Sequence, residues 1–389
     1  MTIIVSATYD HIVAIVIVGM IFIGTVVVLP AVSFSNIDTI DQQQLRNTAY
    51  NVFDAMLLDV GSSSNWGSTF PFDQSEVQKF GLAYADPFSK FVLDPDKVQR
   101  LDPENPGVLE YERVRDLLKL EDYGFQFSLY RPFRVNWTLD IASNEVLFST
   151  TVTRTEDGTP IPNAEVRVTF MVTASKLPKQ SDGDFITEKY DPVVYYTNVT
   201  GSCTGSLTTN LGEYNLDYAV AIMKITVSGL STTVLAQNDN PLTKLIKINT
   251  FGDTITLSFP DALNDTSSER RIVEIDAYDF KNLVRLFKAG DVNPPEVKIT
   301  QGSGYEYWSI TFPGIKTVNP SVLLFAVQVT LKGIGRTLVL IAGPFSFGDS
   351  EKIFDFGPNP YGVSPITLMR RLVVVSDMTY VAELAFWRE

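Results

Sequence analysis

The chain is 389 residues long, 45% hydrophobic and 20% charged, which is enough apolar sequence for two or three folded domains. Its formal net charge of -14 argues against a nucleic-acid partner, because a polyanion would be repelled. With one histidine, His11, and one cysteine, Cys203, histidine- or cysteine-based zinc sites, serine–histidine catalysis and an intramolecular disulfide are all but excluded.

An uncharged run at residues 12–34 predicts a transmembrane helix, because its length crosses a hydrocarbon core of about 30 Å. Residues 1–11 contain no Lys or Arg, which a cleaved secretory signal requires, so we expect the anchor to be retained. Proline near the end of the run would bend the helix. The residues expected in the anchor are Ile12, Ile17, Met20, Phe22, Val27, Pro30 and Phe34.

The helix is expected to continue beyond the membrane as an amphipathic segment that ends at Gly61. Apolar residues there recur mostly at steps of three and four. They are Ile37, Ile40, Leu45, Val52, Phe53, Met56 and Leu57. Two short helices follow in the prediction, one opened by Asp94 and Pro95 and one carrying a stripe from Val108 to Leu118.

From residue 124 the apolar period changes to two, which predicts strands, beginning with Phe125, Phe127 and Leu129. Residues 135–238 show roughly seven short strands separated by turns, a pattern typical of an immunoglobulin-like sandwich. A second β-rich region follows, and its apolar stretch at 322–341 fits two strands better than a second membrane span. The chain should close with a hairpin whose last strand lies inside a sheet.

The predicted fold class is therefore α+β, mainly β, with a long N-terminal helix, short helices and two Ig-like sandwiches. We divide the chain into a tail and transmembrane helix at 1–35 and an amphipathic continuation with short helices at 36–123. A first strand with an Ig-like module follows at 124–238, and a second sandwich at 239–389. We leave open whether the Ig-like module is inserted within the second sandwich or placed before it.

Orientation rests on weak charge evidence, since only Arg46 lies near the C-terminal side of the run. The β-rich part and three Asn-x-Thr tripeptides, at Asn136, Asn198 and Asn264, favour an external location and are candidate glycosylation sites. Unmodified surface turns are the alternative for these asparagines. The predicted localisation is the cell membrane, crossed once, with the C-terminal domains outside.

The acid at Asp10, the uncharged run, Pro30 and the amphipathic segment with a β-rich part behind it resemble an archaeal type IV pilin-like surface protein. The likeness covers residues 1 to about 130 and the final hairpin. It implies an apolar helix that anchors in the membrane or packs in a filament core, with Asp10 as an acid that sets subunit register. Solvation at the membrane edge is the other interpretation of Asp10. Residues 1–11 lack the basic leader of a prepilin, which departs from the family pattern.

The segment from Asp157 to Val166, with the later Gly201 and Gly212 turns, is similar to carboxypeptidase-regulatory-like and bacterial Ig-like modules. Such modules space, stiffen or bind, which implies a part without catalysis. The lone Cys203 is expected to be a small packed residue rather than one half of an intermolecular disulfide.

The sequence thus predicts a membrane-anchored cell-surface protein with a structural or adhesive role, no enzymatic activity and no cofactor or metal. Its expected partners are the lipid bilayer and either copies of itself or a surface-layer or envelope protein. The alternatives are a pilus-like filament subunit, an envelope-binding protein comparable to archaellum stator components, and a hydrolase using paired carboxylates such as Glu274 and Asp276.

Overall fold

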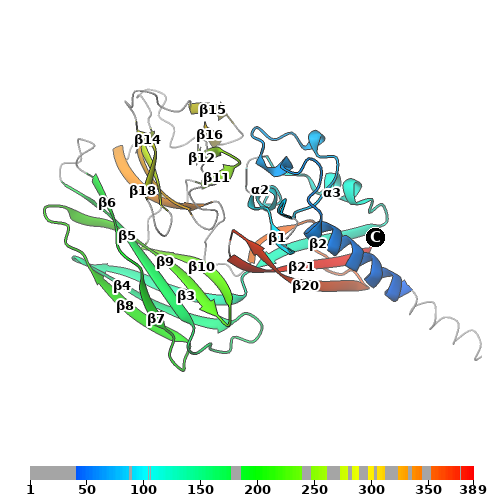
Figure 1. Cartoon of the computed structure of the whole chain (residues 1–389), viewed down its shortest axis with the longest axis horizontal. Helices are drawn as coiled ribbons and strands as arrows, with labels where there is room; N and C mark the ends of the chain where they lie inside the picture. Colours follow the sequence, from blue (N-terminus) through cyan, green and yellow to red (C-terminus); the bar gives the residue numbers. More distant parts are fainter. Residues whose placement is uncertain are drawn as a thin grey trace, which may run out of the picture.

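A computed structural model gives the fold, and strands dominate it (Figure 1), which confirms the mainly β class. The structure describes residues 41–86, 90–103, 105, 107–176, 185–238, 247–260, 272–278, 283–288, 297–301, 305–311, 323–331, 335–343, 352–376 and 378–389. Asp10 and the predicted anchor at 12–34 lie outside these ranges. Among the described residues, no helix combines the length and the apolar character needed to cross a membrane.

Residues 41–58 form the amphipathic helix, whose apolar side is buried as the sequence predicts. Ile37 and Ile40 lie outside the described residues. The helix ends before Gly61, which has a φ of +76° and whose missing side chain leaves room for the Lys79 carbonyl. The predicted residues buried on this face are Leu45, Val52, Phe53, Met56 and Leu57, and the structure adds Ala49.

Both predicted short helices are present, although the second begins later than the apolar stripe suggests. The Asp94 side chain caps α2 by accepting a hydrogen bond from the Asp96 backbone N–H at 3.0 Å. Val108 precedes α3, and Val114 is the fully buried residue of that helix. The short elements of this part are η1 (Trp66–Ser68), η2 (Gln74–Glu76), β1 (Val92–Leu93), α2 (Pro95–Gln99) and α3 (Tyr111–Leu118).

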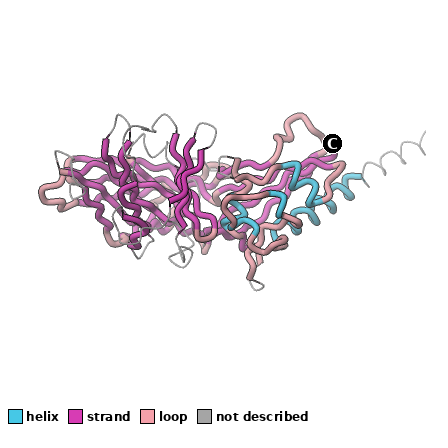
Figure 2. The backbone as a smooth tube through the Cα atoms, turned by 90° about the horizontal axis from the view of Figure 1, so that it is seen from above, coloured by secondary structure: helices cyan, strands magenta, loops and turns pink. Residues whose placement is uncertain are grey.

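A five-stranded sheet, here the terminal sheet, joins this helical part to the end of the chain, in the order β1-β20-β21-β2-β19. β21 pairs antiparallel with both β20 and β2, so the predicted hairpin and the interior place of the last strand are confirmed. Figure 2 shows the helices gathered at the same end of the molecule as the C-terminus. The strands not yet given are β2 (Tyr123–Tyr130), β19 (Lys352–Phe356), β20 (Ile366–Val375) and β21 (Met378–Arg388).

Between β2 and residue 238 the chain forms two facing sheets with a common buried core, here the sandwich. One sheet has the order β3-β4-β8; the other has the order β10-β9-β5-β6, with β7 also paired to β5. The strands are β3 (Phe133–Ala142), β4 (Glu145–Arg154), β5 (Glu165–Ser175), β6 (Phe185–Lys189), β7 (Val193–Tyr196), β8 (Ser202–Thr208), β9 (Asn215–Val227) and β10 (Leu230–Gln237).

Two further four-stranded antiparallel sheets follow, in the orders β11-β12-β16-β15 and β14-β13-β17-β18. β17 and β18 form a hairpin in which Leu331 pairs with Gly335, which confirms strands rather than a second membrane span in this region. The strands are β11 (Lys247–Phe251), β12 (Thr254–Pro260), β13 (Ile272–Tyr278), β14 (Leu283–Lys288), β15 (Val297–Gln301), β16 (Tyr305–Thr311), β17 (Leu323–Leu331) and β18 (Gly335–Gly343).

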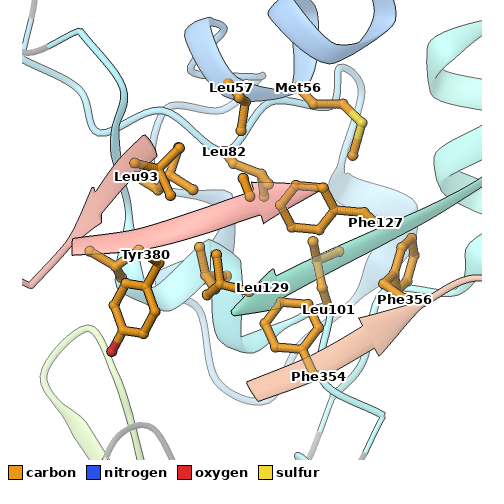
Figure 3. Packing of buried hydrophobic residues seen from close by; sticks show 14 of the residues in the cluster. Met56, Leu57, Leu82, Leu93, Leu101, Phe127, Leu129, Phe354, Phe356 and Tyr380 are labelled. Carbon is orange, nitrogen blue, oxygen red and sulfur yellow. The ribbon is translucent and has the colours of Figure 1, made fainter. Parts of the chain in front are cut away.

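The sandwich sheet that contains β5 and β9 is buried on both faces, because each face lines a different core. Phe170 on β5 and Ala221 on β9 point into the sandwich core. Their neighbours Met171 and Ile222 belong to the core that contains the helix and the terminal sheet, seen from close by in Figure 3. A strand buried on both faces carries a continuous apolar run, which explains the unbroken apolar stretch of β9.

Candidate binding surface on the terminal sheet

The outer face of β20 exposes apolar side chains, although it belongs to a well-buried sheet. Ile366, Leu368 and Leu372 are 41%, 53% and 51% exposed and alternate along the strand with residues that face the core side. They lie opposite Trp387, Ala385 and Val381 of β21. Three exposed large aliphatic residues on one strand face form a patch of the kind that marks interaction sites.

One edge of β20 has no strand partner for most of its length among the described residues. Val374 and Val375 pair in parallel with β1, whereas residues 366–373 have only β21 beside them. An edge strand presents backbone N–H and C=O groups that can pair with another chain. We call this side of residues 366–373 the open edge.

Next to this strand, a groove separates the terminal sheet from the end of the sandwich, with a volume of ≈ 780 Å³. β20 and β21 supply one wall, and the turn between β4 and β5 supplies the other. Its charged residues are Arg131, Arg154, Glu156, Arg370 and Glu383, three cations and two anions. Arg131 is buried, whereas Arg154 and Arg370 are exposed, so the groove presents two accessible cations on a chain whose formal net charge is -14.

Arg370 links the strand to the groove. Its Nε donates to a Glu383 carboxylate oxygen at 2.6 Å, and the Tyr130 hydroxyl donates to the other oxygen at 3.3 Å. The hydrogen bond to Glu383 raises the pKa of Arg370, and Arg370 also lies 3.9 Å from Glu156 on the sandwich. Arg370 is 55% exposed, so its guanidinium remains accessible while its position is held.

On the core side of the same strand, Arg371 joins the terminal sheet to the amphipathic helix. Its guanidinium lies 3.5 Å from the Asp54 carboxylate and 5.1 Å from the centre of the Tyr50 ring. Phe91 provides a second ring at 5.4 Å. These contacts and the buried apolar face of the helix fix residues 41–58 to the sheet.

Sequence reasoning missed a buried cation, Arg100, whose role is structural. Its side chain is fully buried between Phe72 and Phe251, with its central carbon 4.4 and 3.6 Å from the two ring centres. Burial lowers the pKa of Arg100 to about 9, against the opposing effect of the Asp96 charge, so the group is still charged at neutral pH. It donates hydrogen bonds to the backbone carbonyls of Gly67, Thr69 and Gly107.

A second buried cation, Lys97 of α2, is also held by backbone carbonyls. Its ammonium group donates to the carbonyls of Val60 and Ala83, both at 2.9 Å, and lies 3.7 Å from Asp94. Because both cations bind backbone carbonyls of their own fold, they fasten the loops around α2 rather than form a ligand site. The clue in the sequence was the placement of Lys97 and Arg100 beside the apolar Val98 and Leu101.

The predicted glycosylation positions do not gather at the groove. Asn136 is exposed on β3, and Asn198 is exposed in a turn of the sandwich. The side-chain oxygen Oδ1 of Asn198 accepts hydrogen bonds from the Thr200 hydroxyl at 2.7 Å and from the Thr200 and Ser202 backbone N–H groups. Asn264 lies outside the described residues.

Cys203 is packed in the sandwich core as predicted. It is 9% exposed and carries a free thiol. Burial raises the pKa of the Cys203 thiol to about 11, which keeps it protonated at neutral pH.

The carboxylates considered for a hydrolase, Glu274 and Asp276, both lie on β13. In the part of the chain that the structure describes, no group of three His, Cys, Asp or Glu side chains is arranged to hold a metal ion.

Comparison with protein-family models finds no match to this chain, and comparison with curated proteins finds none either.

Proposed function

We propose that the chain is a single-pass, membrane-anchored surface protein of archaeal pilin-like type, whose β-rich part forms a head with a structural or adhesive role. The observation that carries this proposal is the burial of the amphipathic helix in the core of the head, directly after the uncharged run at 12–34.

The packing of the helix against the head determines how freely the head can move relative to the membrane. A helix joined to its head by a flexible linker would let the head swing freely, whereas the helix at 41–58 shares one core with the terminal sheet. The Arg371–Asp54 contact adds a polar link between helix and sheet. An anchor continuous with such a helix holds the head close to the membrane in a defined orientation, which suits a structural or adhesive protein.

Membrane fractionation tests the anchor. A double change of Ile17 and Met20 to Lys places two charges in the apolar run, each costing about 2.5–3.5 kcal/mol at a bilayer centre. We expect this variant to leave the membrane fraction, while the control variant Asn51→Lys, on an exposed helix position, stays there after alkaline washing. Retention of the double variant would contradict the proposal.

Protease treatment of intact cells tests the orientation. We expect cleavage to remove epitopes placed after residue 62 while an N-terminal epitope survives. The opposite pattern would reverse the topology.

A filament subunit is the second candidate, favoured by exposed hydrophobic residues on the helix. Leu58 is 44% exposed on the solvent side of the helix, and Tyr50, at the border of that side beside Arg371, is 47% exposed. In a filament this side would pack against copies of the chain. Recovery of the protein in sheared, detergent-free filaments would favour this candidate over a lone anchor.

A further inference from the structure

We propose that β20 binds an extended, acidic peptide segment of another protein, which adds as a strand to the open edge. This goes beyond the anchored head proposed above and does not depend on it, because every residue involved lies on the terminal sheet or the groove.

The backbone supplies the first argument. Residues 366–373 form a regular antiparallel ladder with β21 on one side and have no described strand on the other. Exposed edges in natural sheets are blocked by short length, proline, a bulge or charges. β20 is ten residues long, its pairing with β21 runs without a register shift, and its proline, Pro365, precedes the strand. It does carry two charges, Arg370 and Arg371, which oppose pairing with a basic strand but favour an acidic one.

The side chains supply the second argument. Strand addition gains affinity from main-chain hydrogen bonds and specificity from alternate side chains. On the outer face, Leu368 and Leu372 are about half exposed and flank Arg370. An incoming strand with apolar residues on this face and an acidic residue beside Arg370 would match the pattern.

The charges on β20 favour a strand of another protein over a second copy of this chain as the occupant of the open edge. In a symmetric antiparallel pairing of two β20 strands about their centre, Arg370 and Arg371 would face or lie diagonal to the same residues of the copy. Like charges at such positions are destabilising. Arg154 is exposed in the adjoining groove and adds a second accessible cation near Arg370, so an acidic segment fits better than a copy of β20.

The test uses the full chain in detergent micelles and a fluorescent nine-residue peptide of alternating Val and Thr with a central Glu. We expect saturable binding by fluorescence anisotropy. We expect binding at least about tenfold weaker when the central residue is Lys, since a charge opposite Arg370 changes sign. A peptide with Pro at alternate positions should not bind, because it lacks the N–H donors of a strand.

Variants of the chain locate the site. Leu368→Glu should weaken binding of the Glu peptide at least about tenfold, by placing a like charge on the open strand. Leu147→Glu is the matched control, since Leu147 is 40% exposed on the outer face of β4, and it should leave binding unchanged. Thermal melts of both variants check that each remains folded.

A third variant, Arg370→Gln, isolates the charge. It should reduce the preference for the Glu peptide over the Lys peptide without abolishing strand addition. An unchanged preference would remove Arg370 from the site.

Three results would overturn the proposal: no binding of the Glu peptide, equal binding of the Glu and Lys peptides, or equal loss of binding in Leu368→Glu and Leu147→Glu. Sedimentation of the full chain adds a fourth. A dimer that Leu368→Glu converts to a monomer would show that a second copy, rather than an acidic partner, occupies the edge.

Discussion

The sandwich and the terminal sheet differ in how far apart their paired strands lie along the chain. All sandwich strands fall between residues 133 and 237, and two of its pairings are simple hairpins, β3 with β4 and β9 with β10. In the terminal sheet β2 pairs with β21, and a side-chain hydrogen bond joins Tyr130 to Glu383, 253 residues away. Closing a long loop costs conformational entropy before any contact forms, so the terminal sheet needs the rest of the chain to fold around it.

The comparison also explains the different cores. The sandwich core is mostly aliphatic, with Val and Ala on β5 and β9. The terminal core adds aromatic rings from segments far apart in the chain, including Phe53, Phe127, Phe354 and Phe386. Large rings bury much area each, which suits a sheet whose strands must be gathered from distant segments. The two cores meet on β5 and β9, so we expect them to unfold together.

Adjacent residues of β5 offer the strongest test of this coupling. Phe170→Ala empties space in the sandwich core and should cost about 3–5 kcal/mol; Met171→Ala empties space in the terminal core and should cost about 2–5 kcal/mol. We expect urea unfolding, followed by fluorescence and circular dichroism, to show one shifted transition in both variants. Two separated transitions in Phe170→Ala would mean that the sandwich unfolds alone.

Removal of the buried cation Arg100 should have the second-largest effect on the stability of the folded chain. Arg100→Met leaves three carbonyls without their donor and removes the charge between Phe72 and Phe251, at a cost of about 3 kcal/mol. Arg167→Ala on the sandwich, where the side chain is 51% exposed, should change stability by less than about 0.5 kcal/mol. Equal effects of the two changes in chemical denaturation would refute a structural role for Arg100.

Gly124 on β2 provides a test of the packing between β2 and β21. A Cβ on Gly124 would overlap the indole of Trp387, so Gly124→Ala should cost about 1–3 kcal/mol through displacement of that ring. Gly158→Asn lies in a sandwich turn with open space around it, and Asn tolerates its left-handed backbone, so it should be nearly neutral. Thermal melting with tryptophan fluorescence distinguishes them, and an unshifted Gly124→Ala melt would argue against this packing.

The smallest expected effect concerns Cys203. Its thiol should react with Ellman's reagent at pH 8 at least about tenfold more slowly in the folded chain than in urea, because it is buried and protonated. Its pKa is raised in the folded state, so the unfolded chain loses this proton first as pH rises. The chain should therefore lose stability relative to Cys203→Ala between pH 9 and 11, and a constant difference would contradict the shift.

The sequence by itself determined the local elements of this protein. Three- and four-residue apolar steps placed the helix that buries Phe53 and Met56, two-residue alternation placed β2 and β3, and two apolar segments around a turn placed the last hairpin. These patterns work because one face of each element is buried and the other is not. The same reasoning passed over β10, whose two faces are not separated by polarity: Thr232 and Thr233 are as buried as its aliphatic residues.

Only the tertiary structure decided which segments meet. It brought β2 beside β21, placed Arg100 between two rings and, among the described strands, gave residues 366–373 a partner on one side only. No local period encodes these features, because pairing across hundreds of residues depends on how all intervening layers pack. The net charge of -14 argues against a nucleic-acid partner; the fold placed three arginines in the lining of one groove of this acidic chain, which the total could not show.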